Sequence, residues 1–543
     1  MYSTKFSITC IFIFNVFCNI QFIFAQDSTY TVTVVEYGPN LNYSLSPEER
    51  LEFNTRNYVD IIAKATENKD MDLIIFPEST LTYLNSYATT AATLPPLYDV
   101  VLCNYSEDSY SKFLEEFSCA AIKYNVTIVI NLTEKDKCDT STNCDETDHI
   151  FYNTNVVFGT NGSLLARYRK FNLFGEYGKS KPAYPDISIF KIRNSSFGLM
   201  TCFDIQFTTP AFNLTRQHQV ENIIFPLNWI SELPFLTALQ TEQMWAQELD
   251  VVLLASGSSN PSRGAGGSGI FLGKNGPLEQ VILSNSSTKI LSHQVSKDAI
   301  STNISLVEGT NDTDVDNIAK TLDDFFMLVD PTIAEHNFKV LNTNENSVTE
   351  TVCHGDEINV LCCNFNVSVT VNEKIENNND YDSYTYLLVA FSGVRTFSGF
   401  YYGGIEQCGV VACLNETVSS CGRRFSNYSN VIWPLTINSI NITGNFSSSE
   451  NKIQFPTTLL SSIHPLPVSH YTWDYETRDS QIIKRLELNK PQSRLLAFGI
   501  YGRDFSRDWD PLRNNTGNDG SGSNVVKGSL MSLFLLVVVS LIL

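Results

Sequence analysis

The stretch Leu73-Ile-Ile-Phe-Pro-Glu78 decides the fold class, because a short apolar run leads straight into a proline and an acid. Such a run is typical of a strand inside a sheet. Upstream, Thr31-Val-Thr-Val-Val35 predicts another strand. Between the two, Ser46-Pro-Glu-Glu49 has the N-cap serine, the proline at the first helical position and the capping-box glutamate that begin a helix. Strand, helix and strand in this order predict a layered α/β domain.

The alternation of strands and helices continues to about residue 300 and then stops. We expect helices at 109–122 and 234–249, and further strands at 126–130, 155–158, 164–169, 195–201, 222–225 and 251–255. After about residue 305 few stretches are helical, and strands are expected at 367–371, 384–391, 431–437 and 495–500. The sequence therefore predicts an α/β domain over 26–305, a β-rich second domain over 306–507 and a polar tether over 508–523.

Length and composition agree with two folded domains. A chain of 543 residues is too long for one comfortable core. Hydrophobic residues make up 43% of the chain and charged residues 17%, which is far from the composition of a disordered protein. The formal net charge of −21 excludes nucleic acid as a partner, because a nucleic-acid binder needs a basic surface.

Both ends of the chain carry targeting patterns. Lys5, the apolar stretch 11–17 and the small Ala25 predict a signal peptide over 1–25. Residues 530–543 are apolar except for two serines, but they are short for a membrane span, which needs about 20 residues. A run of small residues and a spacer precede this tail, which is the pattern of a glycolipid (GPI) anchor signal. The tail would be removed over 524–543, and the attachment candidates are Gly520, Ser521 and Ser523.

These patterns predict an extracellular protein that a glycolipid holds on the outer face of the cell membrane. A retained tail anchor and a soluble product are the alternatives. Asn-x-Ser/Thr sequons recur along the chain and support passage through the secretory pathway, although any single site can be buried and unmodified. The glycosylation candidates are Asn42, Asn104, Asn125, Asn131, Asn161, Asn194, Asn213, Asn285, Asn303, Asn311, Asn366, Asn415, Asn427, Asn441, Asn445 and Asn514.

The cysteines predict one free thiol. Of the 13, Cys10 and Cys18 leave with the signal peptide, and an oxidising compartment would pair all but one of the odd number that remains. Cys202 stands alone at the end of an apolar run, whereas six others cluster between residues 353 and 421. An unpaired buried cysteine is usually only a small hydrophobic residue. No CxxC pair or histidine-rich spacing indicates zinc, so we expect no metal and no cofactor.

Three lone residues, Glu78, Lys170 and Cys202, each follow an apolar run. Their side chains can therefore project from strand ends, where α/β sheets place their sites. Taken singly, Glu78 could be a solvated turn residue and Lys170 one of three cations on an exposed strand end. Their combination is more informative than any one of them.

The segments around these residues resemble, in order and spacing, the Glu, Lys and Cys motifs of the nitrilase superfamily. They are 73–78, Tyr168-Arg-Lys-Phe-Asn-Leu-Phe-Gly-Glu176 and Gly198-Leu-Met-Thr-Cys-Phe-Asp204. Further segments resemble the vanin and biotinidase branch, namely 201–207 with Pro210, 226–229, Trp245 and 267–270, and more loosely Cys353, 362–363 and 408–421. The resemblance implies a nitrilase-type α-β-β-α layered sandwich followed by a β-rich domain stapled by disulfides.

What the resemblance implies is a thiol amidohydrolase. Cys202 would be the nucleophile that forms a thioester, Glu78 the base that takes the thiol proton and returns it to the leaving amine, and Lys170 the cation that faces the oxyanion. Glu176 matches a second glutamate of the family, which orients the lysine or the water, and a purely structural acid is an equal alternative. Asp204 would either contact substrate or brace the turn after the cysteine.

The substrate would be a small linear carboxamide. In vanins it is pantetheine, which gives pantothenate and cysteamine, and in biotinidase it is biocytin. The glycolipid-anchor signal favours the vanin side. A catalytically inactive cell-surface binding protein is the rival from another class. The oligomeric state and the disulfide pairing stay open at this stage.

Overall fold

The computed structural model describes residues 29–40, 42, 44–82, 87–105, 109–138, 149–296, 311–357, 359–372, 381–478 and 480–509. The predicted signal peptide, the anchor signal and the attachment candidates Gly520, Ser521 and Ser523 lie outside these residues. Within the described ranges, no helix has the length and apolar character of a membrane span.

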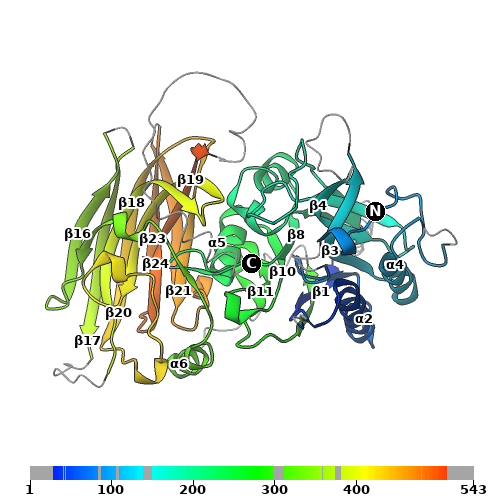
Figure 1. Ribbon diagram of the computed structural model, residues 1–543. Helices are drawn as coiled ribbons and strands as arrows, with labels where there is room; N and C mark the ends of the chain where they lie inside the picture. Colours follow the sequence, from blue (N-terminus) through cyan, green and yellow to red (C-terminus); the bar gives the residue numbers. More distant parts are fainter. Residues whose placement is uncertain are drawn as a thin grey trace, which may run out of the picture.

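Two six-stranded sheets form the centre of the first domain (Figure 1). The first runs in the order β13 (Lys289–Ser296), β1 (Thr29–Glu36), β2 (Leu73–Ile75), β3 (Thr127–Lys137), β4 (His149–Phe158) and β5 (Leu164–Arg169). The second runs in the order β12 (Pro277–Val281), β11 (Ser268–Leu272), β10 (Val252–Gly257), β8 (Asn222–Leu227), β7 (Ser195–Leu199) and β6 (Ile189–Ile192).

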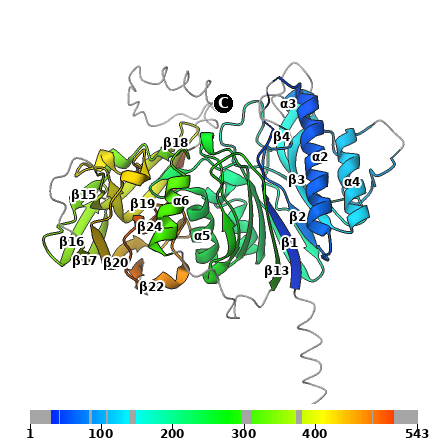
Figure 2. The ribbon, with the colours of Figure 1, turned by 90° about the horizontal axis from the view of Figure 1, so that it is seen from below.

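Helices cover the outer faces of both sheets. Helices α2 (Pro47–Thr66) and α4 (Lys112–Tyr124) pack on the first sheet, and α5 (Ala238–Leu249) packs on the second (Figure 2). In β1, Val34 lies in the core between the sheets and Val35 in the core beneath the helices, because successive side chains of a strand point to opposite faces. The predicted α-β-β-α layering is confirmed.

The helix ends follow their caps. In α2 the Ser46 Oγ accepts from the Glu49 N–H at 3.1 Å and the Glu49 carboxylate accepts from the Ser46 N–H at 2.7 Å, as the capping box predicts. Helices α4 and α5 begin three and four residues later than expected, because Ser111 and Thr237 are the N-cap residues. A short helix, α3 (Tyr87–Thr90), lies between α2 and α4 in the chain.

The second domain consists of two five-stranded antiparallel sheets, which confirms the β-rich prediction. One has the order β15 (Asn337–Val340), β18 (Thr385–Phe397), β19 (Tyr401–Cys413), β24 (Leu495–Trp509) and β21 (Lys452–Leu460). The other has the order β16 (Ser347–His354), β17 (Leu361–Val371), β20 (Leu435–Ser447), β23 (Gln481–Leu488) and β22 (Tyr471–Arg478). Helix α6 (Asp312–Thr321) precedes them, and α5 lies where the domains meet (Figures 1 and 2).

Two strands, β14 and β24, differ from the domain boundaries that the sequence predicted. Strand β14 (Leu328–Val329) follows α6 but pairs in parallel with β9 (Glu232–Leu233) of the first domain. Strand β24 reaches Trp509, so Asp508, the expected first residue of the tether, belongs to the sheet. Its carboxylate accepts from Arg503 at 2.9 Å, which holds the end of the strand.

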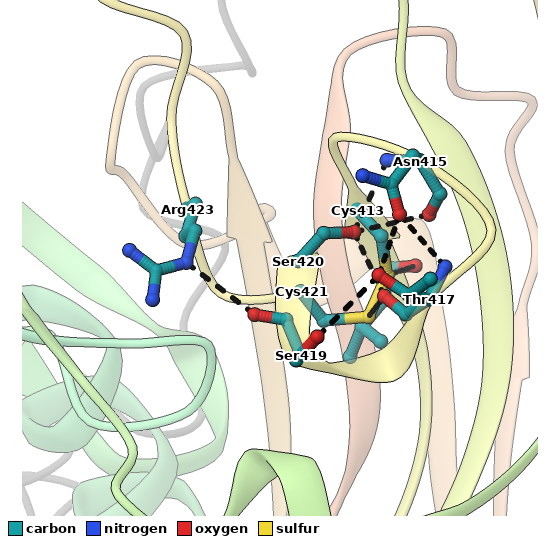
Figure 3. The surroundings of a disulfide bond; sticks show 8 residues. Cys413, Asn415, Thr417, Ser419, Ser420, Cys421 and Arg423 are labelled. Carbon is teal, nitrogen blue, oxygen red and sulfur yellow. Dashed lines mark hydrogen bonds between the residues drawn. A yellow bond between two sulfur atoms is a disulfide. The ribbon is translucent and has the colours of Figure 1, made fainter.

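Four disulfides lie in the described residues: Cys103–Cys119, Cys353–Cys362, Cys363–Cys408 and Cys413–Cys421. Cys363 lies in β17 and Cys408 in β19, so this bond joins the two sheets of the second domain. The bond between Cys413 and Cys421 closes the loop after β19 (Figure 3). The free cysteine among these residues is Cys202, as the odd count predicts.

The sequons differ in accessibility. In the loop of Figure 3, Asn415 is exposed, and its side chain accepts from the Thr417 hydroxyl at 2.6 Å. Asn131 is 1% exposed in β3, so we expect no glycan on it in the folded protein. Asn303 and Asn514 lie outside the described residues, and Asn213 and Asn441 are half-buried. The other candidates are exposed: Asn42, Asn104, Asn125, Asn161, Asn194, Asn285, Asn311, Asn366, Asn427 and Asn445.

Candidate active site

Cys202 lies in a sharp turn just beyond β7. It is the first residue of the 3₁₀ helix η2 (Cys202–Gln206) and has φ = +46°, a left-handed conformation that a non-glycine residue adopts only when its surroundings hold it there. The side chain is 6% exposed. The turn therefore directs one buried thiol away from the sheet.

Asp204 holds this turn in place. Its carboxylate accepts from the Thr201 N–H at 3.0 Å, from the Tyr168 hydroxyl at 2.7 Å and from Asn172, whose backbone and side-chain N–H groups lie at 2.9 and 2.8 Å. Burial raises the pKa of Asp204 to about 6, although these donors oppose the shift. Of the two roles considered for this residue, bracing is the one that these contacts support.

Glu78 and Lys170 meet beside the cysteine. Glu78 follows β2 and Lys170 follows β5, and Lys170 Nζ donates to Glu78 Oε1 at 2.8 Å. Lys170 Nζ also donates to Glu176 Oε1 at 2.5 Å. Burial lowers the pKa of Lys170, but the charges of Glu176 and Glu78 outweigh it and hold this pKa well above its usual range. The lysine is therefore a fixed cation between two carboxylates.

The thiol of Cys202 is held in its neutral form. Burial, and next the charge of Glu78, raise its pKa well above the usual value, while Lys170 opposes the shift. Cys202 lines one hollow together with Glu78, Lys170 and Asn228. The Asn228 backbone N–H donates to Glu78 Oε2 at 2.9 Å. A base beside the thiol can remove its proton as the sulfur attacks a carbonyl carbon.

A chain of three buried asparagines supports these groups, and the sequence reasoning missed it. Asn153 Nδ2 donates to Glu78 Oε1 at 2.7 Å. Asn131 Nδ2 donates to the side-chain oxygens of Asn153 and Asn155 at 2.7 and 2.9 Å. Asn155 in turn donates to the Thr201 hydroxyl at 2.8 Å, next to the cysteine. The available signal was amide side chains next to apolar residues within the strands β3 and β4.

Two hollows meet at Cys202. The smaller, which we call the apolar hollow, has a volume of about 40 Å³ and is lined mainly by Phe174, Phe203, Trp229, Leu236 and Phe397. The larger, the polar hollow, has about 90 Å³ and contains Glu78, Lys170 and Glu176, with Tyr177, Asn260 and Arg263 farther along. Phe397 belongs to β18, so the second domain forms part of the site.

Comparisons with known proteins agree with this architecture. The carbon-nitrogen hydrolase family matches residues 31–256, and the vanin C-terminal domain matches residues 325–508. The chain is similar to Vanin-like protein 1 of Drosophila melanogaster, with 32% identity over 90% of this chain and 88% of that protein. It is similar to the human pantetheinase (28% identity, 89% and 90%) and to the human biotinidase (26%, 89% and 90%).

The two matched families, in the order of the two observed domains, identify the class of enzyme. A relative with 32% identity that this chain covers over 88% of its length is close enough to fix the family. The chain belongs to the vanin family of carbon-nitrogen hydrolases, enzymes that hydrolyse carbon-nitrogen bonds other than peptide bonds.

Proposed function

We propose that the protein hydrolyses a linear amide through a thioester on Cys202, and that its substrate is pantetheine. The observation that carries the proposal is that one free thiol, one carboxylate and one ammonium line the same buried site, with the ammonium bonded to the carboxylate. Glu78 takes the thiol proton while Cys202 Sγ bonds the amide carbon, and the carbonyl oxygen becomes an oxyanion beside Lys170. In a desolvated site one such donor stabilises the transition state by about 3 kcal/mol.

The remaining steps return every proton. The tetrahedral intermediate collapses, the carbon-nitrogen bond breaks, and Glu78 gives its proton to the leaving amine. Water then loses a proton to Glu78 as its oxygen bonds the thioester carbon. When the carbon-sulfur bond breaks, Glu78 returns that proton to the sulfur. The products are an acid and an amine, and Cys202 is again a thiol.

The size of the apolar hollow supports pantetheine. A cavity needs about 10–15 Å³ to hold one water-sized group, so about 40 Å³ accommodates roughly three. This matches the two methylenes and the thiol of the cysteamine half. The lysine half of biocytin carries charged groups that would lose their hydration there. The relatives named pantetheinase support the same choice.

The test is a paired assay on the purified ectodomain, by which we mean residues 26–523, without the predicted signal peptide and anchor signal. We expect the wild type to release cysteamine from pantetheine much faster than lysine from biocytin, and Cys202→Ala to release neither. Preferred cleavage of biocytin would refute the substrate. A folded wild type that, like Cys202→Ala, cleaves neither amide would instead support the inactive binding protein.

We also propose that the mature protein is extracellular and anchored by a glycolipid at Gly520, Ser521 or Ser523. The disulfides agree with an oxidising compartment. In transfected animal cells, phosphatidylinositol-specific phospholipase C should release the protein from the surface. A variant truncated before residue 524 should appear in the medium without the enzyme. Full-length protein that resists release would contradict the anchor.

A further inference from the structure

One buried arginine of the second domain contacts the segment beside the catalytic thiol. Arg395 lies in β18 and is 1% exposed. Its Nη1 and Nη2 donate to the two carboxylate oxygens of Glu232 at 2.6 and 2.8 Å, a bidentate pair across the domain interface. Its Nη1 also lies 3.2 Å from Asp330 Oδ2, just after β14.

Glu232 belongs to the segment 228–232, which joins β8 to β9 and borders the site. This segment begins with Asn228, whose N–H donates to Glu78 and which lines the polar hollow together with Cys202. Asn228 and Ile230 line both hollows, and Glu232 itself lines the apolar one. The far end of the segment is thus fixed by the arginine, and its near end contacts the reacting groups.

Contacts within the first domain also hold the middle of this segment: Trp229 Nε1 donates to the Leu236 carbonyl at 2.9 Å, and Ser231 Oγ accepts from the Ala238 N–H at 3.2 Å. The Ser231 N–H donates to the Gly264 carbonyl at 2.9 Å, and Glu232 and Leu236 exchange two backbone hydrogen bonds at 3.1 and 2.9 Å. The charged anchor, the ion pair of Glu232 with Arg395, comes from the second domain. Two residues beyond Arg395, Phe397 lines the apolar hollow with its ring 5.4 Å from that of Phe203.

We propose that Arg395 is a positioning residue for the active site, which acts through Glu232 to fix the Asn228 N–H against Glu78 and Cys202. The proposal rests on the proposed function, because it assigns the second domain a part in that same reaction. Lysine at position 395 would keep the charge but lose the bidentate pair. The segment could then shift, and a displacement of about 1 Å at a reacting group can cost about 100-fold in rate.

A rival explanation is that Arg395 only contributes to the stability of the folded protein. A matched control separates the two. Arg494 makes a similar two-nitrogen pair with Asp316 of α6, with distances of 3.1 and 2.8 Å, and neither residue lines a hollow at Cys202. Arg494→Lys should therefore lower stability without changing catalysis.

The experiment compares Arg395→Lys, Glu232→Gln and Arg494→Lys in the ectodomain. Measurements are the Tm, kcat/KM for pantetheine and the rate constant for alkylation of Cys202 by iodoacetamide at fixed pH. We expect the first two variants to lose about 10-fold or more in kcat/KM and to change the alkylation rate, at temperatures where they remain folded. The Arg494→Lys variant should stay within about twofold of wild type in kcat/KM and in the alkylation rate.

The double variant Arg395→Lys/Glu232→Gln should lose no more than the worse single variant, because both break one contact. The proposal is overturned if folded Arg395→Lys and Glu232→Gln both keep wild-type activity and alkylation, or if Arg494→Lys loses as much. If Arg395→Lys does not fold, Glu232→Gln decides alone. If the wild type cleaves no amide, the proposed function fails, and the alkylation rates still test the positioning.

Discussion

Replacing Glu176 by glutamine tests the role of the second glutamate. Both of its oxygens are engaged: Oε1 accepts from Lys170 Nζ at 2.5 Å and Oε2 accepts from the Phe174 N–H at 2.5 Å. Glutamine keeps the size but removes the charge from the bond to the lysine. Charge-assisted hydrogen bonds contribute about 1.5–3 kcal/mol and neutral ones about 1 kcal/mol, so the change should cost about 0.5–2 kcal/mol. This corresponds to roughly 2- to 30-fold in rate.

The slowed step reveals which partner Glu176 orients. Because its oxygens hold the lysine, we expect slower acylation: cysteamine release falls about 10-fold with no burst, and intact mass shows no acyl-enzyme. Glu406→Gln is the matched control, since Glu406 Oε1 accepts from Lys452 Nζ at 2.8 Å in the second domain. A burst followed by slow turnover, with acyl-enzyme present, would refute this reasoning and assign Glu176 to the water. Unchanged kinetics would leave it a structural acid.

Three other predictions follow from buried polar groups. Asn153→Leu should lower kcat/KM for pantetheine about 10-fold, because Glu78 loses a donor at 2.7 Å; an unchanged value would contradict the support role. Glycopeptide mapping should find a glycan on the exposed Asn415 and none on Asn131, and a glycan on Asn131 would contradict its burial. Glu242→Gln should raise Tm, increasingly as pH rises from about 5, because burial raises the pKa of Glu242 well above its usual range and ionisation then favours the unfolded chain. Both Glu242 oxygens lack a partner among the described residues, and equal melting curves from pH 5 to 8 would contradict this account.

Local sequence patterns predicted the layered α/β arrangement of the first domain. The residues of the candidate active site were harder to predict. Alternation in β1 and the capping box at Ser46 encode the sheet faces and the start of α2, because each depends on neighbours in the chain. Glu78, Lys170 and Cys202 each follow an apolar run, but it was the resemblance of their segments to the nitrilase motifs that grouped them. Arg395 gave no such signal: its partner Glu232 lies 163 residues away, and only the packing of the two domains brings them together.

The asparagine chain was missed for a different physical reason. In sequence, Asn131 followed by Leu132 and Thr133 is a glycosylation sequon, and the same amide can serve as a donor or an acceptor. Burial decides between these uses, and burial of an amide depends on what the neighbouring strand offers. Here β4 places Asn155 opposite Asn131 and supplies the partners.

The arrangement of charges explains why the lysine has two carboxylates. In the resting site Lys170 binds both Glu78 and Glu176, and the two carboxylates offset the positive charge that a bound substrate would experience. In the proposed mechanism Glu78 becomes neutral when it takes the thiol proton, and its attraction for the ammonium falls at the moment the oxyanion forms. Glu176 remains charged and keeps the lysine in place. The ammonium of Lys170 therefore stays in place while its attraction to the new oxyanion becomes stronger. This stabilises the transition state more than the bound amide.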